Sequence, residues 1–117
     1  MVDTIRSSMD LASHAEVTLE SNPDDFTVTK LDEFLDSGIN RLSIGVQSLD
    51  DRLLELLGRR HSADDAVRAY RMASEAGFDN VSIDLMYGLP QQTLEQWERT
   101  LDGAAELSPA HVSLYGL

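Results

Sequence analysis

Polar residues stand where short apolar segments end, and their types could bind a ligand. Glu20, Asp84 and Tyr115 each follow, by two positions, a Thr or Ser within such a segment. In a fourth segment, Gly45 follows Ser43 by two positions, and Gln47 comes two residues later. Carboxylates, an amide and a phenol offer hydrogen-bond acceptors and donors. For each residue alone, a solvated loop position is the simpler interpretation in so acidic a chain. Their common spacing from the hydroxyl favours one shared ligand site.

Arg59 joins this group through the expected topology. It belongs to the basic cluster at 58–61, Gly-Arg-Arg-His, which comes just before a helix expected to begin at Ser62. That helix must run back to feed the strand at 81–83, so its start lies near the carboxyl ends of the strands, where parallel sheets bind ligands. An arginine there can hold a carboxylate through two parallel hydrogen bonds.

The rest of the basic cluster has structural interpretations. One of Arg59 and Arg60 is expected to neutralise acids near it in sequence, such as Asp50, Asp51, Asp64 and Asp65. His61 is expected at the helix entry or on the surface, because His14 and His111 stand at no metal-ligand spacing from it. We therefore expect no metal site in this cluster.

The elements that must position these residues alternate along the chain. A pattern of aliphatic, hydroxyl, aliphatic recurs and predicts short buried strands. These segments are 17–19, 42–44, 81–83 and 112–114. Amphipathic segments between them predict helices, and one more is expected around Ile5 and Met9. The expected N-caps are Thr27, Ser48, Ser62 and Thr93. Gly38 and Gly77 are expected to end two helices in the left-handed conformation.

Strands that alternate with helices predict an α/β fold with a parallel sheet, because each helix returns the chain to start the next strand in the same direction. The period of two puts the hydroxyls of Thr18, Ser43, Ser82 and Ser113 on one face and the aliphatic residues on the other. An open doubly wound sheet is apolar on both faces, so we expect a barrel or partial barrel with a polar interior. Small residues that simply fill a tight barrel are the alternative.

Length indicates a single segment, 1–117, of a larger fold. A complete barrel of this kind needs about 250 residues, whereas this chain has 117 and four expected strands. The last residue, Leu117, falls where the fourth strand would end, and no helix follows to cover that strand. We therefore expect an internal fragment of a longer protein, with sheet edges exposed in isolation.

Composition argues against several classes of protein. There are 21 acidic and 9 basic residues, a net charge of −12, which disfavours nucleic acid and anionic membranes as partners. Without cysteine, these residues can form no disulfide and no Cys-ligated iron–sulfur cluster. Charges and hydroxyls occupy the first residues, and no stretch approaches the ~20 apolar residues of a membrane span. The expected location is the cytoplasm.

Several motifs occur in a fixed order along the chain. They are Glu-Ser-Asn-Pro at 20–23, Gly-Ile-Asn-Arg-Leu-Ser-Ile-Gly-Val-Gln-Ser at 38–48, Leu-Gly-Arg-Arg-His at 57–61 and Asp-Leu-Met-Tyr-Gly-Leu-Pro-Gln-Gln-Thr at 84–93. From about residue 16 onward, the chain resembles the radical SAM proteins related to oxygen-independent coproporphyrinogen III oxidase. Glu-x-Asn-Pro, Gly-Val-Gln-Ser and Gly-Arg-x-His resemble the HemW-type haem chaperones, whereas the oxidases favour an aspartate before the proline and after the glutamine.

The resemblance implies a TIM-like partial barrel, (β/α)6, to which this chain contributes four β/α units. It also implies that S-adenosylmethionine lies across the carboxyl ends of the strands, beside a [4Fe-4S] cluster that breaks its sulfonium bond by donating one electron. The family's S-adenosylmethionine contacts match Glu20, Gln47, Arg59 and Asp84. Arg59 would hold the methionyl carboxylate, while Gln47 and the acids would hold the ribose hydroxyls or the ammonium group.

The chain departs from the family in lacking the Cys-x-x-x-Cys-x-x-Cys loop and the glycine-rich segment that follows it. We therefore expect these residues alone to be inactive, with no catalytic residue and no metal ligand among them. The resemblance implies a parent protein that binds haem and delivers it to client proteins. Alternatives are a parent that decarboxylates two propionates of coproporphyrinogen III, and a stand-alone α/β module that binds a small anion at Arg59.

Overall fold

A four-stranded sheet forms the centre of the computed structural model, which describes all residues from 1 to 117. Its strands are β1 (Thr18–Ser21), β2 (Arg41–Gln47), β3 (Val81–Tyr87) and β4 (His111–Gly116). They lie side by side in sequence order, and all neighbouring pairs are parallel. The predicted α/β class and the predicted parallel sheet are confirmed. β2 and β3 extend beyond the predicted segments toward their carboxyl ends, where the candidate site residues stand.

The helices begin largely where capping residues predict. They are α1 (Val2–Ser8), a 3-10 turn η1 (Pro23–Asp25), α2 (Val28–Asp36), α3 (Asp51–Leu56), α4 (Ala63–Ala76) and α5 (Leu94–Leu107). Thr27, Ser62 and Thr93 cap α2, α4 and α5 with their side-chain oxygens. Gly38 and Gly77 follow α2 and α4 with φ of +96° and +112°, as predicted. None of the helices has both the length and the apolar character needed to cross a membrane.

The predicted N-cap Ser48 is wrong. Asp50 caps α3 instead, because its Oδ1 accepts a hydrogen bond from the Leu53 amide at 3.1 Å. The Ser48 side chain is buried, and its hydroxyl lies 3.4 Å from Thr100 Oγ1. Ser48 therefore lies two residues before the cap, where its hydroxyl accepts from the Asp50 amide at 3.1 Å and also contacts α5, remote in sequence.

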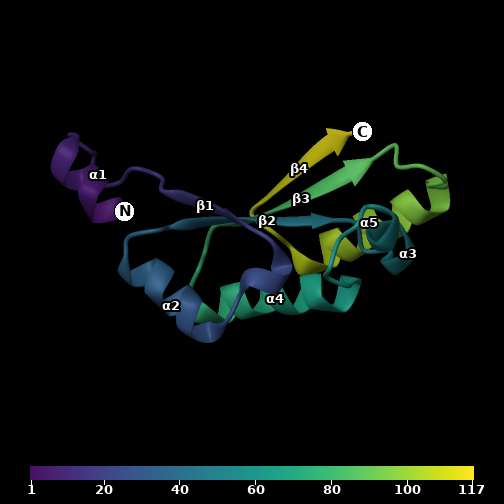
Figure 1. Cartoon of the computed structure of the whole chain (residues 1–117), viewed down its shortest axis with the longest axis horizontal. Helices are drawn as coiled ribbons and strands as arrows, with labels where there is room; N and C mark the ends of the chain where they lie inside the picture. The colour runs from purple at the N-terminus through teal and green to yellow at the C-terminus, as the bar shows by residue number, and fades with distance from the viewer.

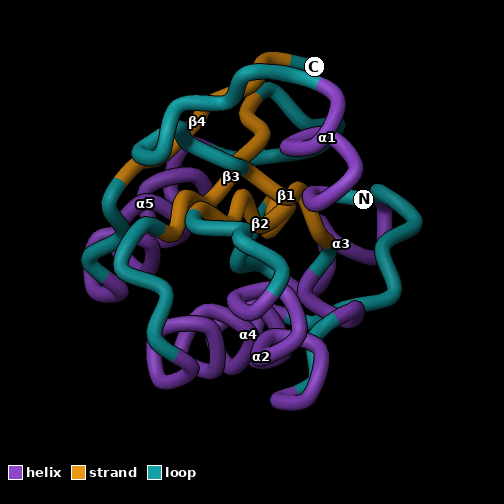
Figure 2. Tube along the Cα trace, turned by 90° about the vertical axis from the view of Figure 1, so that its left-hand side faces the viewer, coloured by secondary structure: helices purple, strands orange, loops and turns teal.

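Helices pack against only one face of the sheet, the aliphatic face. In Figures 1 and 2, α2 and α4 lie together on the same side of the sheet. Sequential parallel strands send each crossover to the same face, because the crossovers share one handedness. The buried core there comprises Leu31, Leu42, Ile44, Val46, Ala66, Ala69, Ala73, Val81, Ile83, Leu85 and Ala104, with a few residues around them. This one-sided arrangement is that of a barrel wall rather than of a doubly wound sheet.

The opposite face of the sheet is polar, as predicted. Strand register places Thr18 beside Arg41, Ser43 beside Ser82, and Asp84 beside Ser113. Every one of these side chains projects to the face that carries no helix, because alternate residues of a strand share a face. The strand residues expected to bind a ligand therefore lie on this polar face, toward the carboxyl ends of the strands.

Candidate functional site

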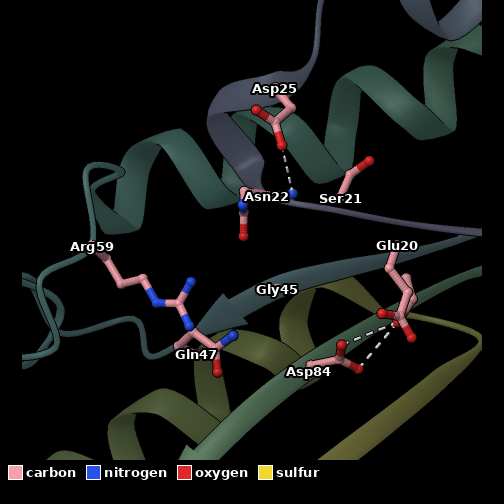
Figure 3. A pocket seen from close by; sticks show the side chains of 9 residues that line it. Glu20, Ser21, Asn22, Asp25, Gly45, Gln47, Arg59 and Asp84 are labelled. Atoms are coloured by element: carbon pink, nitrogen blue, oxygen red, sulfur yellow. Dashed lines mark hydrogen bonds between the residues drawn. The ribbon is translucent and has the colours of Figure 1, made fainter.

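A polar cavity of about 310 Å³ lies at the carboxyl ends of β1, β2 and β3. Nine residues line it and none is hydrophobic: Glu20, Ser21, Asn22, Asp25, Ser43, Gly45, Gln47, Arg59 and Asp84. The structure thus brings together all four predicted binding residues, Glu20, Gln47, Arg59 and Asp84. In Figure 3, Glu20 and Asp84 lie toward one end of the cavity, and Arg59 with Gln47 toward the other.

Separate elements supply these side chains. Glu20 stands on β1, Gln47 ends β2 and Asp84 stands on β3, whereas Arg59 lies in the loop between α3 and α4. Because the three strands are parallel, their carboxyl ends share one edge of the sheet, and the loop before α4 returns to that edge. Tyr115 of β4, which the sequence spacing groups with these residues, is exposed and does not line the polar cavity.

Asp84 is held in place by a hydroxyl of the neighbouring strand. Ser43 Oγ donates to the Asp84 carboxylate and lies 3.2 Å from Oδ1 and 3.1 Å from Oδ2. Both residues line the cavity, and Asp84 is only partly buried. A carboxylate oriented by one donor retains free lone pairs that can accept hydrogen bonds from a ligand.

The end of β2 departs from regular strand geometry at Gln47. The pairing register with β3 shifts between Ile44 and Gln47, and Gln47 has a φ of +67°. Left-handed backbone is uncommon for residues other than glycine, and such irregularities re-aim side chains near binding sites. Gly45 leaves room for the side chains of Gln47 and Asn22, since an added Cβ would lie 3.2 Å from Gln47 Nε2 and 3.4 Å from Asn22 Oδ1.

The two adjacent arginines have different surroundings. Arg60 Nε lies 3.7 Å from Asp24 Oδ2, whereas Arg59 takes part in none of the ion pairs of the chain and reaches into the cavity. The prediction that one of the pair neutralises an acid is thus confirmed. The partner is not among the four acids predicted, because folding brings η1 against the loop 58–61.

His61 is buried, so its predicted surface position is wrong and its predicted place at the helix entry is right. Its side chain is 4% exposed, and Nε2 lies 2.9 Å from the carbonyl oxygen of Val46. Because a carbonyl only accepts, Nε2 is the protonated nitrogen. Val46 precedes Gln47, and His61 follows Arg59 by two positions. This hydrogen bond therefore ties together the two segments that carry Gln47 and Arg59.

Three cavity residues were not predicted: Ser21, Asn22 and Asp25. Asn22 belongs to the motif Glu-Ser-Asn-Pro, but the sequence analysis assigns it no contact with a ligand. In the structure it caps η1, and the Asn22 amide donates to Asp25 Oδ2 at 3.1 Å (Figure 3). The spacing Asn-x-x-Asp is a capping-box signal that could have located this turn. The turn faces the cavity because β1 delivers it at the same edge of the sheet.

The charge of the cavity favours a cationic ligand that also has one anionic group. Glu20, Asp25 and Asp84 contribute carboxylates, against the single guanidinium of Arg59. The excess of carboxylates attracts positive charge, whereas Arg59 can bind one carboxylate or phosphate. Nowhere in the chain do three or more His, Asp or Glu side chains form a group that could hold a metal ion.

Comparison with known proteins identifies the family of the chain. The family model described as the radical SAM superfamily matches residues 2–104. Heme chaperone HemW of Bacillus subtilis (strain 168) is 43% identical over 97% of this chain and 29% of its own length. HemW of Escherichia coli (strain K12) is 41% identical over 100% of this chain and 31% of its own length.

A solved structure extends the likeness to three dimensions. Coproporphyrinogen III oxidase (HemN) from Escherichia coli, described as a radical SAM enzyme, superposes with a TM-score of 0.88 at 33% identity. The superposition covers 98% of this chain and 26% of that one, so the chain spans less than a third of the proteins it matches. With a family model matched over most of its length and this barrel segment reproduced, the chain belongs to the radical SAM superfamily.

Proposed function

We propose that the polar cavity binds S-adenosylmethionine. The observation that carries the proposal is the convergence of Glu20, Gln47, Arg59 and Asp84 on one cavity that has no hydrophobic lining. S-adenosylmethionine has a positive sulfonium, a positive ammonium and a negative carboxylate. The cavity offers the complementary set, with carboxylates in excess and one arginine. Superfamily membership supports the same ligand.

Each of the four side chains has a chemically suitable role. Arg59, which has no ion-pair partner in the chain, would take the methionyl carboxylate. Glu20, Asp84 and Gln47 would accept hydrogen bonds from the ribose hydroxyls or the ammonium group. Gly45 keeps the strand backbone accessible between Asn22 and Gln47, where a side chain would take up the space. When bound, S-adenosylmethionine supplies a sulfonium whose carbon–sulfur bond radical SAM chemistry breaks by one-electron reduction.

The residues of this chain do not fit the [4Fe-4S] cluster that the superfamily implies. There is no cysteine in the sequence, and the structure contains no group of metal-ligating side chains. We therefore assign to these residues the binding and orientation of S-adenosylmethionine, and no step of the reaction that depends on the cluster.

A titration of the chain with S-adenosylmethionine, followed by NMR, tests the proposal. We expect the amide signals of Gly45, Gln47 and Asp84 to move, because these residues line the cavity. S-adenosylhomocysteine, which lacks the sulfonium charge, is the matched control ligand. It is expected to bind about tenfold more weakly, since the acidic cavity loses one charge attraction. A folded chain whose cavity signals respond to neither ligand would contradict the proposal.

For the whole protein we propose a HemW-like role in haem delivery, with haem and haem-receiving client proteins as partners and a cytoplasmic location. The identities of 43% and 41% to HemW proteins support it. The motifs Glu-x-Asn-Pro at 20–23 and Gly-Arg-x-His at 58–61 support the same branch. The alternative is an oxygen-independent coproporphyrinogen III oxidase, which the structural likeness to HemN favours.

The full-length gene product distinguishes these two roles. We expect haem binding, seen as a Soret absorption on titration, and no vinyl product from coproporphyrinogen III under reducing, anaerobic conditions. Decarboxylation of the porphyrinogen would select the oxidase instead. A third alternative, a stand-alone module for small anions, is disfavoured because the cavity has three carboxylates and only one guanidinium.

A further inference from the structure

A row of hydrogen bonds leads along the polar face of the sheet to the carboxylate of Asp84. Arg41 Nη2 lies 2.8 Å from Ser82 Oγ, and Ser82 Oγ lies 3.2 Å from Ser43 Oγ. Ser43 Oγ in turn lies 3.1 Å from the nearer Asp84 oxygen. We name these four residues, Arg41, Ser82, Ser43 and Asp84, the polar row. It alternates between β2 and β3 and reaches the cavity from the amino-terminal side of the sheet.

The chemistry of the two ends determines the direction of every bond in the polar row. An ionised carboxylate only accepts, so the single proton of Ser43 is donated to Asp84. Ser43 must then accept from Ser82, whose own proton is thereby used. Ser82 must accept from Arg41, and a guanidinium only donates. The positive end and the negative end thus align both hydroxyls in one sense, which strengthens each bond in the row.

Burial prevents water from taking over these roles. Ser82 is 0% exposed and Ser43 is 6% exposed, while the Arg41 side chain is 19% exposed. Arg41 is also held from the side of β1, because its Nη1 donates to Thr18 Oγ1 at 3.3 Å and its Nε lies 3.9 Å from Glu16. The guanidinium therefore has a defined place from which it can orient the hydroxyls.

We propose that Arg41 and Ser82 are positioning residues that act on the ligand cavity through Ser43 and Asp84. By fixing the direction in which Ser43 donates, they hold the Asp84 carboxylate in one orientation relative to the ligand cavity. Serines whose only role is to fill space inside a tight barrel would not need hydroxyls that donate in one fixed direction. The nature of the ligand rests on the function proposed above, but the positioning of Asp84 does not.

The test is the side-chain carboxyl ¹³C resonance of Asp84 at pH 7, without ligand, identified by its loss in Asp84→Asn. Ser82→Ala removes the central hydroxyl without changing charge, and we expect the resonance to move. Arg41→Met removes the donor at the far end and leaves both hydroxyls present, and again the resonance should move. Ser113→Ala is the matched control. Its hydroxyl is on the same face, in the register position beside Asp84, yet it bonds only His111.

Binding measurements complete the test. In Ser82→Ala the affinity for S-adenosylmethionine is expected to fall about tenfold. In the Asp84→Asn background the same substitution should cause no further loss, because residues that act through one another are not additive. If the Asp84 resonance does not move in a variant that circular dichroism shows to be folded, the positioning role is overturned. A moved resonance in a chain that binds no S-adenosylmethionine upholds it and refutes the proposed ligand instead.

Discussion

Two neighbouring arginines of identical chemistry have different partners in the fold. Arg60 points to Asp24 of η1, whereas Arg59 lines the cavity without an ion-pair partner. An exposed ion pair contributes little to stability. The free guanidinium is available for a ligand carboxylate, with which it can form two charge-assisted hydrogen bonds. The pair therefore offers a test in which the control differs from the variant by one position.

Arg59→Ala is expected to weaken S-adenosylmethionine binding by about 2 kcal/mol, or roughly thirtyfold, because it removes the proposed partner of the ligand carboxylate. Arg60→Ala should change the affinity less than about threefold, since it removes only a surface pair. Isothermal titration calorimetry on both variants measures the difference. Equal losses in the two variants would show that general positive charge, rather than Arg59 itself, holds the ligand.

The elements that flank the cavity are joined by the buried side chain of His61. The loop before α4 carries Arg59, and the end of β2 carries Gln47. The bond from His61 Nε2 to the Val46 carbonyl, at 2.9 Å, connects them. Val46 is buried, and its carbonyl accepts both this bond and one from the Ser48 amide at 2.8 Å.

His61→Ala is expected to lower the free energy of unfolding by about 1–3 kcal/mol, because it opens a small cavity and removes one of the two hydrogen bonds to the Val46 carbonyl, which keeps the Ser48 amide as its partner at 2.8 Å. Urea denaturation followed by circular dichroism measures this loss. His111→Ala is the control, because His111 is exposed on β4, and its effect should stay within about 0.5 kcal/mol. A similar small effect for His61 would mean that the link between the loop and β2 contributes little.

Helix α4 begins with a capping box that makes its stability depend on pH. The Asp65 carboxylate accepts from the Ser62 amide at 2.9 Å, and Ser62 Oγ accepts from the Asp65 amide. Hydrogen bonds from the Ser62 backbone and side chain lower the pKa of Asp65 below its ordinary value of 3.8. Burial opposes this shift, and the charges of Arg68 and His61 add to it.

A lowered pKa in the folded state gives stability that is present above pH 3.8 and is lost as the pH falls through the folded value. The difference in unfolding free energy between the wild type and Asp65→Asn should therefore shrink as the pH is lowered below 3.8. Denaturation at a series of pH values measures it. Asp64→Asn, which changes an acid of the same turn outside the capping box, should show no comparable dependence on pH. A difference that stays constant down to low pH would contradict the capping role.

Over the entire chain, burial is uneven across the sheet. Ile44 of β2 is fully buried beneath the helices, whereas Leu114 of β4 is 51% exposed. β4 pairs with β3 along its length, but no element of the chain covers its aliphatic side (Figure 1). The hydrophobic contribution to stability is therefore concentrated in β2 and β3.

Ile44→Ala is expected to cost about 2–5 kcal/mol of unfolding free energy, because it removes buried methyl groups and leaves a cavity. Leu114→Ala should cost less than about 1 kcal/mol, since half of that side chain is already in water. Thermal and urea denaturation compare the two variants. A large loss for Leu114 would indicate that β4 is covered in solution, for example by a second copy of the chain.

Signals that depend on a few neighbouring residues were sufficient to predict most of the elements. The caps at Ser62 and Thr93 and the glycines at 38 and 77 act within one turn of a helix, so the sequence contains all the groups involved. The polar face also followed from the sequence, because strand geometry alternates residues whatever the strand packs against. The prediction failed at Ser48, which lies two residues before the cap and contacts Thr100 of α5, a contact that spacing along the chain does not reveal.

The amino-acid sequence determined the strand–helix alternation, the parallel direction and the side of each strand on which Glu20 and Asp84 project, since these follow from local backbone geometry and short connections. Only the tertiary structure decided which remote groups meet. It pairs Arg60 with Asp24, buries His61 against Val46 and aligns Arg41 with the serines of two strands. Such contacts depend on the twist and register of the assembled sheet, which spacing along one chain does not encode.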